Sequence, residues 1–185
     1  MKLRNGLTTV LLAASAVLLV WALFVALPRR VGPEGGGAAG SAGPAVPGRK
    51  IIANLFYVAP DGTTLAPMER EVAFGETTIE QARAIITAQL EPVDPPLVSA
   101  VPPGTKLRAL FITPSGEAYV DLTREFVDAH PGGSMNERLT VYTLVDALIL
   151  NLPAITSVQL LADGREIDTL AGHVDLRRPL SRQLR

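Results

Sequence analysis

An uninterrupted apolar run near the N-terminus constrains this chain more than any other feature. Residues 7–27, from Leu7 to Leu27, contain no charged residue, no proline and no glycine. A helix rises about 1.5 Å per residue, so roughly 20 apolar residues cross the hydrocarbon core of a bilayer. The run therefore predicts a transmembrane helix, and the membrane is the first binding partner that we expect for this protein.

The length and the end of the run distinguish a retained anchor from a cleaved signal peptide. The apolar part of a signal peptide is usually about 7–15 residues long and leads into a cleavage site with small residues at alternate positions. Val25 stands where such a site would need a small residue, and the small residues at 14–16 lie inside the apolar run. We therefore expect an uncleaved, single-pass signal-anchor.

Basic residues flank the run on both sides, so the charge rule for orientation is nearly balanced. Lys2 and Arg4 precede the run, whereas Arg29 and Arg30 follow it, and an excess of Lys and Arg marks the cytoplasmic side of a span. A short basic head before a long apolar run is typical of an export signal. We therefore expect residues 1–6 to be a cytoplasmic head and the C-terminal domain to be extracytoplasmic, held at the cell membrane.

Composition divides the exported part of the chain into three segments. Residues 28–49 are rich in glycine, proline and alanine and hold no aromatic residue. Such a segment cannot bury enough apolar area to offset its ordering entropy, so it predicts a flexible linker. Residues 50–180 have a length and composition that suit one folded domain, and residues 181–185 are a basic tail.

The charge and the cysteine content exclude several classes of function. Residues 51–180 contain 17 Asp and Glu against nine Lys and Arg, a net charge of −8. Nucleic-acid binding depends on neutralising phosphates with basic side chains, so we expect no nucleic-acid partner. The chain has no cysteine, which excludes disulfides, thiolate metal sites, a cysteine nucleophile and a lipid-modified cysteine.

Alternating apolar residues between turn signals predict five strands, and helical spacing predicts two helices. The strands are expected at residues 50–58, 65–74, 106–113, 118–122 and 157–162, with a further edge segment at 166–170. The first helix is expected to begin after a cap at Thr77 or Thr78. The second opens with Ser134 and Glu137 at the spacing of a capping box and ends before Pro153.

The two predicted helices decide the expected architecture. Each carries one apolar stripe that it cannot bury alone, so we expect both to pack on one face of a mostly antiparallel sheet. The predicted fold class is therefore α+β, with two layers, following the N-terminal transmembrane helix.

The domain resembles a known family, the GerMN domain of spore-germination and sporulation proteins and of bacterial envelope lipoproteins. The resemblance extends from about Ile51 to Leu180 and depends on the order and spacing of several short motifs. These motifs are Phe56-Tyr57 before the Asp61-Gly62 turn, residues 65–72, residues 101–107, Val120-Asp121-Leu122 with Phe126, Gly132-Gly133-Ser134, Glu137-Arg138-Leu139, residues 158–161 with Gly164, and residues 172–176.

The resemblance implies a non-catalytic module at the outer face of the bacterial membrane, with a fold similar to ring-building motifs. Envelope or sporulation-complex proteins, or further copies of the chain itself, are the partners that it implies. A role in sporulation or germination follows from the family association alone. The family carries no agreed set of active-site residues, so we predict no catalytic, cofactor-binding or metal-binding residue and no cofactor.

An alternative function is a serine-dependent hydrolase. Ser134 follows two glycines at a helix N-terminus, and His130, His173 and Asp175 could complete a triad. Each of these residues also has a structural explanation, with Ser134 as a helix cap, and we expect no catalysis. The two histidines are 43 positions apart, which is not the clustered spacing of metal ligands.

Two further hypotheses concern binding. Asp121 follows an apolar strand near the loop of Gly132 and Gly133, and we expect its carboxylate to bind the amides of that loop. A small ligand-sensing domain of the cell envelope is the remaining alternative. It needs a concave site with convergent polar groups, whereas Tyr57 and Tyr119 are too dispersed to indicate one.

Overall fold

A computed structural model of the chain describes residues 48–182. The predicted head, anchor, most of the linker and the last residues of the tail lie outside this range. Within the described part of the chain, no helix has the length and apolar character to span a bilayer. The elements are β1 (Lys50–Val58), β2 (Leu65–Ala73), α2 (Thr78–Gln89), β3 (Leu107–Ile112), β4 (Glu117–Leu122), α3 (Glu125–Asp128), α4 (Ser134–Asn151), β5 (Ser157–Ala162) and β6 (Arg165–Glu166).

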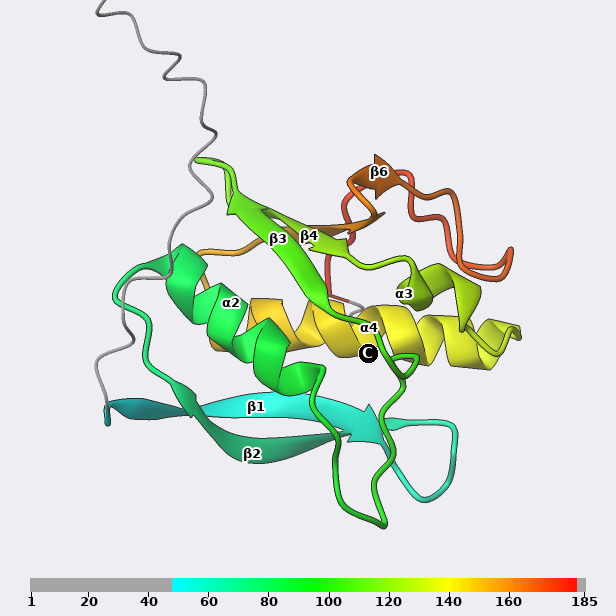
Figure 1. Cartoon of the computed structure of the whole chain (residues 1–185), viewed down its shortest axis with the longest axis horizontal. Helices are drawn as coiled ribbons and strands as arrows, with labels where there is room; N and C mark the ends of the chain where they lie inside the picture. Colours follow the sequence, from blue (N-terminus) through cyan, green and yellow to red (C-terminus); the bar gives the residue numbers. More distant parts are fainter. Residues whose placement is uncertain (1–47, 183–185) are drawn as a thin grey trace, which may run out of the picture. The chain divides into compact units, whose positions relative to one another are not determined.

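The strands form two sheets, with the long helices between them (Figure 1). The strands β1 and β2 pair as an antiparallel hairpin, and a second sheet has the order β3-β4-β5-β6. The helix α2 contacts β1, β2 and β3, while α4 contacts β1 and β5. The α+β class is confirmed, but the expectation of one sheet with both helices on a single face is wrong.

The helices need two covering sheets because each is apolar on more than one side. Ile85 and Ile86 are consecutive in α2, and both are fully buried. Successive residues of a helix point about 100° apart, and these two lie in different cores. Ile86 belongs to the core under the four-stranded sheet, and Ile85 to the core under the hairpin. On α4, Leu144 and Ala147 are divided between the two cores in the same way.

The centre of the larger sheet also differs from expectation. The pairs β3-β4 and β5-β6 are antiparallel, but β4 and β5 are parallel. Parallel neighbours cannot be joined by a tight turn and need a crossover connection, and α4 provides most of that connection. The sheet is therefore mixed, although most of its strand pairs are antiparallel, as predicted.

The local signals were reliable for most elements. The first helix begins as predicted, because Thr77 Oγ1 accepts a hydrogen bond from the Glu80 amide and Glu80 Oε2 accepts one from the Thr77 amide (3.2 and 3.0 Å). The strand at 50–58 is confirmed with its predicted ends. The short helix α3 was not predicted, and the last strand, β6, ends at Glu166 instead of continuing to residue 170.

Candidate functional site

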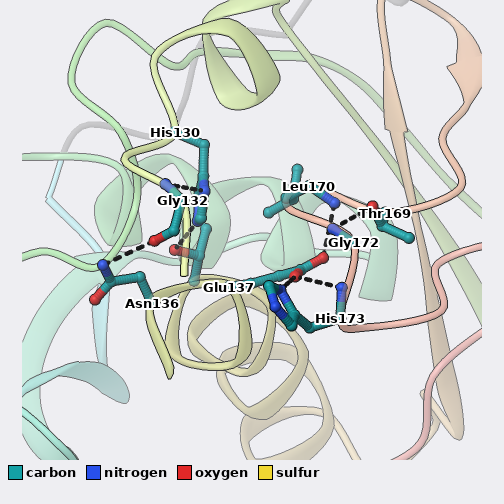
Figure 2. A network of polar contacts seen from close by, with 9 residues as sticks. His130, Gly132, Asn136, Glu137, Thr169, Leu170, Gly172 and His173 are labelled. Atoms are coloured by element: carbon teal, nitrogen blue, oxygen red, sulfur yellow. Dashed lines mark hydrogen bonds and ion pairs between the residues drawn. The ribbon is translucent and has the colours of Figure 1, made fainter. Parts of the chain in front are cut away.

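Residues 167–176, here called the C-terminal loop, are held to the first turn of α4 by one buried carboxylate. The Glu137 side chain has no exposed area. Its Oε1 accepts a hydrogen bond from the Leu170 amide, and its Oε2 accepts one from the His173 amide (both 2.8 Å). The His173 ring also lies against it, with Nδ1 3.1 Å from Oε2 (Figure 2). A buried charge needs such partners, because desolvation without them is very costly.

The loop amides keep this carboxylate ionised. Burial by itself raises the pKa of Glu137, because it disfavours the charged form. The backbone N–H groups of Ala171, Leu170, His173 and Val174 act in the opposite direction, and the pKa lies below its ordinary value of 4.5. The C-terminal loop is therefore fixed by a charged side chain that is fully enclosed by the protein.

This arrangement corrects the predicted cap of the second long helix. The N-cap position is Gly133, with φ of 86°, and no side chain caps it. Ser134 already lies inside the helix, and Glu137 points to the C-terminal loop instead of back to its own helix. Asn136 Nδ2 donates to the Gly132 carbonyl (2.9 Å) and so attaches the preceding glycine loop to the first turn.

The other histidine belongs to a separate chain of hydrogen bonds. His130 Nδ1 accepts from the Gly132 amide (3.1 Å), so its proton is on Nε2, which lies 3.2 Å from Thr140 Oγ1. Thr140 Oγ1 in turn donates to the Ala100 carbonyl (2.7 Å). Burial lowers the pKa of His130, which favours the neutral ring that this network requires.

The residues of the hypothetical hydrolase are thus engaged elsewhere. Among residues 48–182, no hydrogen bond joins Ser134 to either histidine. His173 binds Glu137, and Asp175 binds the Arg177 guanidinium through two contacts of 2.9 Å. The Arg177 side chain lowers the pKa of Asp175 to about 2. In the same part of the chain, no group of three or more acidic or histidine side chains is placed to hold a metal ion.

Asp121 binds a loop amide as expected, but the loop is a different one. Its Oδ1 accepts from the Gly164 amide (2.7 Å) and its Oδ2 from Arg108 Nη1 (2.9 Å). The predicted partners were Gly132 and Gly133. The parallel pairing of β4 with β5 explains the difference, because it places the end of β4 beside the turn that follows β5.

A groove that the sequence did not reveal lies beside the C-terminal end of α2. It has a volume of about 850 Å³ and is lined mainly by apolar groups of the proline-rich connection between α2 and β3. Its wall includes Leu90, Pro92, Leu97, Val98, Pro103 and Leu107. Val98 is 61% exposed. The pattern of prolines in this connection does not say which face of the domain the loop covers, so the sequence carries no signal for the groove.

Side chains close the free edge of β1. The Asn54 amide donates to Asn151 Oδ1 (2.8 Å), and Asn151 Nδ2 donates to the Asn54 carbonyl (2.7 Å). Gln89 makes the same pair of bonds with Phe56, at 2.8 Å each. The backbone of Val98 then bonds to Val58 in both directions. Two side-chain amides and one loop residue therefore take the place of a neighbouring strand.

The edges of the larger sheet are also occupied in part. Arg83 Nη2, from α2, donates to the Leu110 carbonyl on β3 (3.1 Å). On the other side, β5 pairs with β6, and its Val158 exchanges two backbone hydrogen bonds with Leu180 (2.8 Å each). The sequence signal for such closures is weak, because a polar residue on a helix is normally interpreted as a solvent-facing one.

The outer edge of β2 differs from the outer edge of β1 in how its backbone groups are bonded. The backbone hydrogen bonds from the Phe74 N–H to Arg49 and from the Ala59 N–H to Thr64, at the two ends of the hairpin, show which residues bond across it. Residues 66, 68, 70 and 72 then face β1, whereas residues 65, 67, 69, 71 and 73 direct their backbone groups away from it. Ala73 O is bonded by Gln81 Nε2 (3.1 Å). Within residues 48–182, no hydrogen bond reaches the outward backbone groups of Pro67, Glu69 and Glu71.

Comparison with known proteins identifies related sequences and folds. The family model Germane, described as "Sporulation and spore germination", matches residues 54–168. No curated protein matches the sequence.

Three solved structures share the fold. A putative lipoprotein from Clostridium perfringens has a TM-score of 0.52 and 19% identity, over 71% of this chain and 87% of that chain. The first GerMN domain of the sporulation protein GerM from Bacillus subtilis has a TM-score of 0.56 and 16% identity, over 71% and 98%. The tandem GerMN domains of the same protein give 0.53 and 18%, over 74% and 46%.

Proposed function

Because the chain belongs to the Germane family of sporulation and spore-germination proteins, we propose that it is a membrane-anchored, extracytoplasmic interaction module without catalytic activity. One observation carries the proposal. The buried carboxylate of Glu137 and the ring of His130 both bind the domain's own backbone. Groups that could perform acid–base or nucleophilic chemistry are thus used to hold the fold together, while an unpaired strand edge and an apolar groove face outward.

The membrane part of the proposal is supported by the sequence. The apolar run at residues 7–27 is long enough to span a bilayer, and residues 28–49 would connect it to the domain. With the N-terminus inside, the domain works at the outer face of the cell membrane, on envelope or sporulation-complex proteins.

A second candidate is a ligand-sensing domain of the envelope, and the groove beside α2 is the observation that favours it. Its volume of about 850 Å³ lies in the usual range for small-molecule sites, about 300–1,000 Å³. Few polar side chains line the groove, and two of them are engaged within the domain, because Glu91 pairs with Arg70 and Thr105 Oγ1 donates to the Pro102 carbonyl. We therefore place this function second.

The proposal is tested on the full-length protein in its native membrane. Chemical crosslinking followed by mass spectrometry should identify envelope proteins as neighbours, and protease added from outside should reach the domain. Recovery of the intact protein from the cytosol would contradict the anchored topology. Hydrolysis of ester or peptide substrates that is lost on Ser134→Ala would overturn the non-catalytic assignment.

A further inference from the structure

We propose that the open edge of β2 binds an extended basic segment of a partner protein, which adds to the hairpin as a third strand. The proposal rests on the proposed function as an interaction module and names the surface and the chemistry of the partner. Strand addition to a free sheet edge is a common mode of peptide recognition, in which main-chain hydrogen bonds supply the affinity.

The two edges of the hairpin differ in how their outward backbone groups are bonded. On β1, the side chains of Gln89 and Asn151 occupy the outward backbone groups of Phe56 and Asn54. On β2, among the bonds made within residues 48–182, only the terminal Ala73 carbonyl is occupied, by Gln81. The β1 edge of the hairpin is therefore closed by side chains, whereas the backbone of the β2 edge is available to a partner.

The outer edge of β2 offers backbone hydrogen-bond donors and acceptors at three residues. Glu69 and Glu71 each direct one N–H and one C=O away from the hairpin, and Pro67 directs a C=O. Proline is tolerated in a sheet only where its missing N–H is not needed for the ladder. At position 67 that missing donor lies on the outward side, so pairing with β1 is intact while only one outward donor is lost.

The β2 edge carries negatively charged side chains. The side chains of Glu69 and Glu71 lie on the same face of the hairpin, roughly 6.6 Å apart along the strand, and both residues are exposed. Glu71 makes an exposed ion pair with Lys50 (2.9 Å), and the register places Asn54 opposite Glu69. Cross-strand pairs of opposite charge stabilise a sheet. An added strand with Lys or Arg at alternate positions would therefore match this edge.

The same two glutamates disfavour pairing of β2 with β2 of a second copy of this chain. Antiparallel pairing of β2 with another β2 centred on Glu69 or on Arg70 places glutamate directly opposite glutamate. Like charges in that position are destabilising. Pairing centred on Met68 avoids this but places Pro67, which has no N–H, opposite Glu69. We therefore assign the occupant as a different protein with a basic extended segment, because its side chains match the charge of this edge.

The competing explanation is that Pro67, Glu69 and Glu71 only prevent aggregation, as charges and prolines on edge strands often do. Under that explanation, no peptide adds to the edge. The two explanations differ in a measurable way, because strand addition requires both matching charge and free backbone groups.

The test uses the full-length protein and a fluorescent nine-residue peptide in which valine alternates with lysine. Binding is followed by fluorescence anisotropy. Two derivatives carry methyl groups on backbone amide nitrogens, one derivative at its lysines and the other at its valines. Each derivative blocks one edge of the peptide without changing its charge. We expect one of the two to lose binding by about tenfold or more, since only one edge of the peptide can pair with β2. Equal binding of all three peptides would overturn the proposal.

Protein variants supply the second arm. Glu69→Lys/Glu71→Lys should weaken binding of the unmodified peptide by about tenfold or more. The control Glu76→Lys/Glu166→Lys makes the same change in charge at exposed residues outside β2 and should change binding by less than about twofold. Equal loss in the two variants would show that only net charge matters and would overturn the proposal.

Crosslinking in the native membrane separates this proposal from the proposed function. If the wild-type protein has no envelope neighbours, the interaction module itself is refuted. If it has neighbours that the Glu69→Lys/Glu71→Lys variant keeps, the module stands and the β2 edge is refuted. Selective loss of a neighbour in this variant, but not in the control, is the result that we expect.

Discussion

Two parts of the domain treat exposed backbone in opposite ways. The C-terminal loop and the β1 edge are closed by polar side chains from helices, namely Glu137, Gln89 and Asn151. The β2 edge is left open along Pro67, Glu69 and Glu71 by the part of the chain that the structure describes. Both edges of the hairpin belong to the same small sheet, so the strand pattern does not explain the contrast. Both strands contact α2, but Gln89 and Asn151 reach backbone groups inside β1, whereas Gln81 reaches only the terminal residue of β2.

The comparison predicts that mutations lower the free energy of unfolding to different extents. The largest effect is expected for the most buried side chain that bonds to the backbone of another segment. Glu137→Gln in the full-length chain should lower the free energy of unfolding by about 3–5 kcal/mol, because an amide N–H₂ then faces backbone donors in a buried site. Chemical denaturation measures this. Glu69→Gln is the matched control on the open edge, and a similar loss there would remove the distinction between the two regions.

Gln89→Met should have the next largest effect. Gln89 is fully buried, and the substitution keeps the volume of the side chain while leaving the Phe56 N–H and C=O without a partner. We expect a loss of about 2–4 kcal/mol in the free energy of unfolding. A variant as stable as the wild type would mean that water or a backbone shift closes this part of the β1 edge.

Asn151→Leu should lower the free energy of unfolding by less, about 1 kcal/mol, although Asn151 makes the same kind of paired hydrogen bonds with the backbone of Asn54. Asn54 is exposed, so water can replace the lost partner. The melting temperatures of the Gln89 and Asn151 variants, measured side by side, check this order. The reverse order would indicate that burial does not determine how much these side-chain hydrogen bonds contribute to stability.

Lowering the pH should weaken the hydrogen bonds between Glu137 and the C-terminal loop before it affects those made by the uncharged side chains of Gln89 and Asn151. The pKa of Glu137 is lowered by folding, so its contribution is complete above the ordinary value of about 4.5 and is lost as the pH falls through the folded value. The difference in stability between wild type and Glu137→Gln should therefore shrink between pH 6 and roughly pH 3. A constant difference would show that the charge of Glu137 is not what holds the C-terminal loop.

The smallest effect on folding is expected at the open edge itself. Replacing Pro67, Glu69 and Glu71 together by valine should change the free energy of unfolding by less than about 1 kcal/mol, because the three residues are exposed and the ion pair of Glu71 with Lys50 lies at the surface. The same variant should self-associate, since an apolar unprotected edge pairs with other edges. Sedimentation velocity measures this, and a strictly unchanged sedimentation coefficient would mean that the edge is protected in another way.

The two helix starts show how far local sequence can be trusted. Thr77 with Glu80 and Ser134 with Glu137 have the same spacing, and both predict a capping box. The first is confirmed. In the second, Glu137 binds amides 33 and 36 positions further along the chain. The local pattern could not anticipate that a distant loop would offer several donors in a buried place.

The sequence by itself determined what depends on neighbours along the chain: the α+β class, most strand positions, the first helix cap and the family. Only the tertiary structure decided that the helices lie between two sheets, that Asp121 binds the Gly164 turn, and that β1 is closed while β2 is open. The physical reason is that periodicity reports how many faces of an element are apolar, whereas the partner of each face, and of each buried polar group, is selected by which distant segments fold against it.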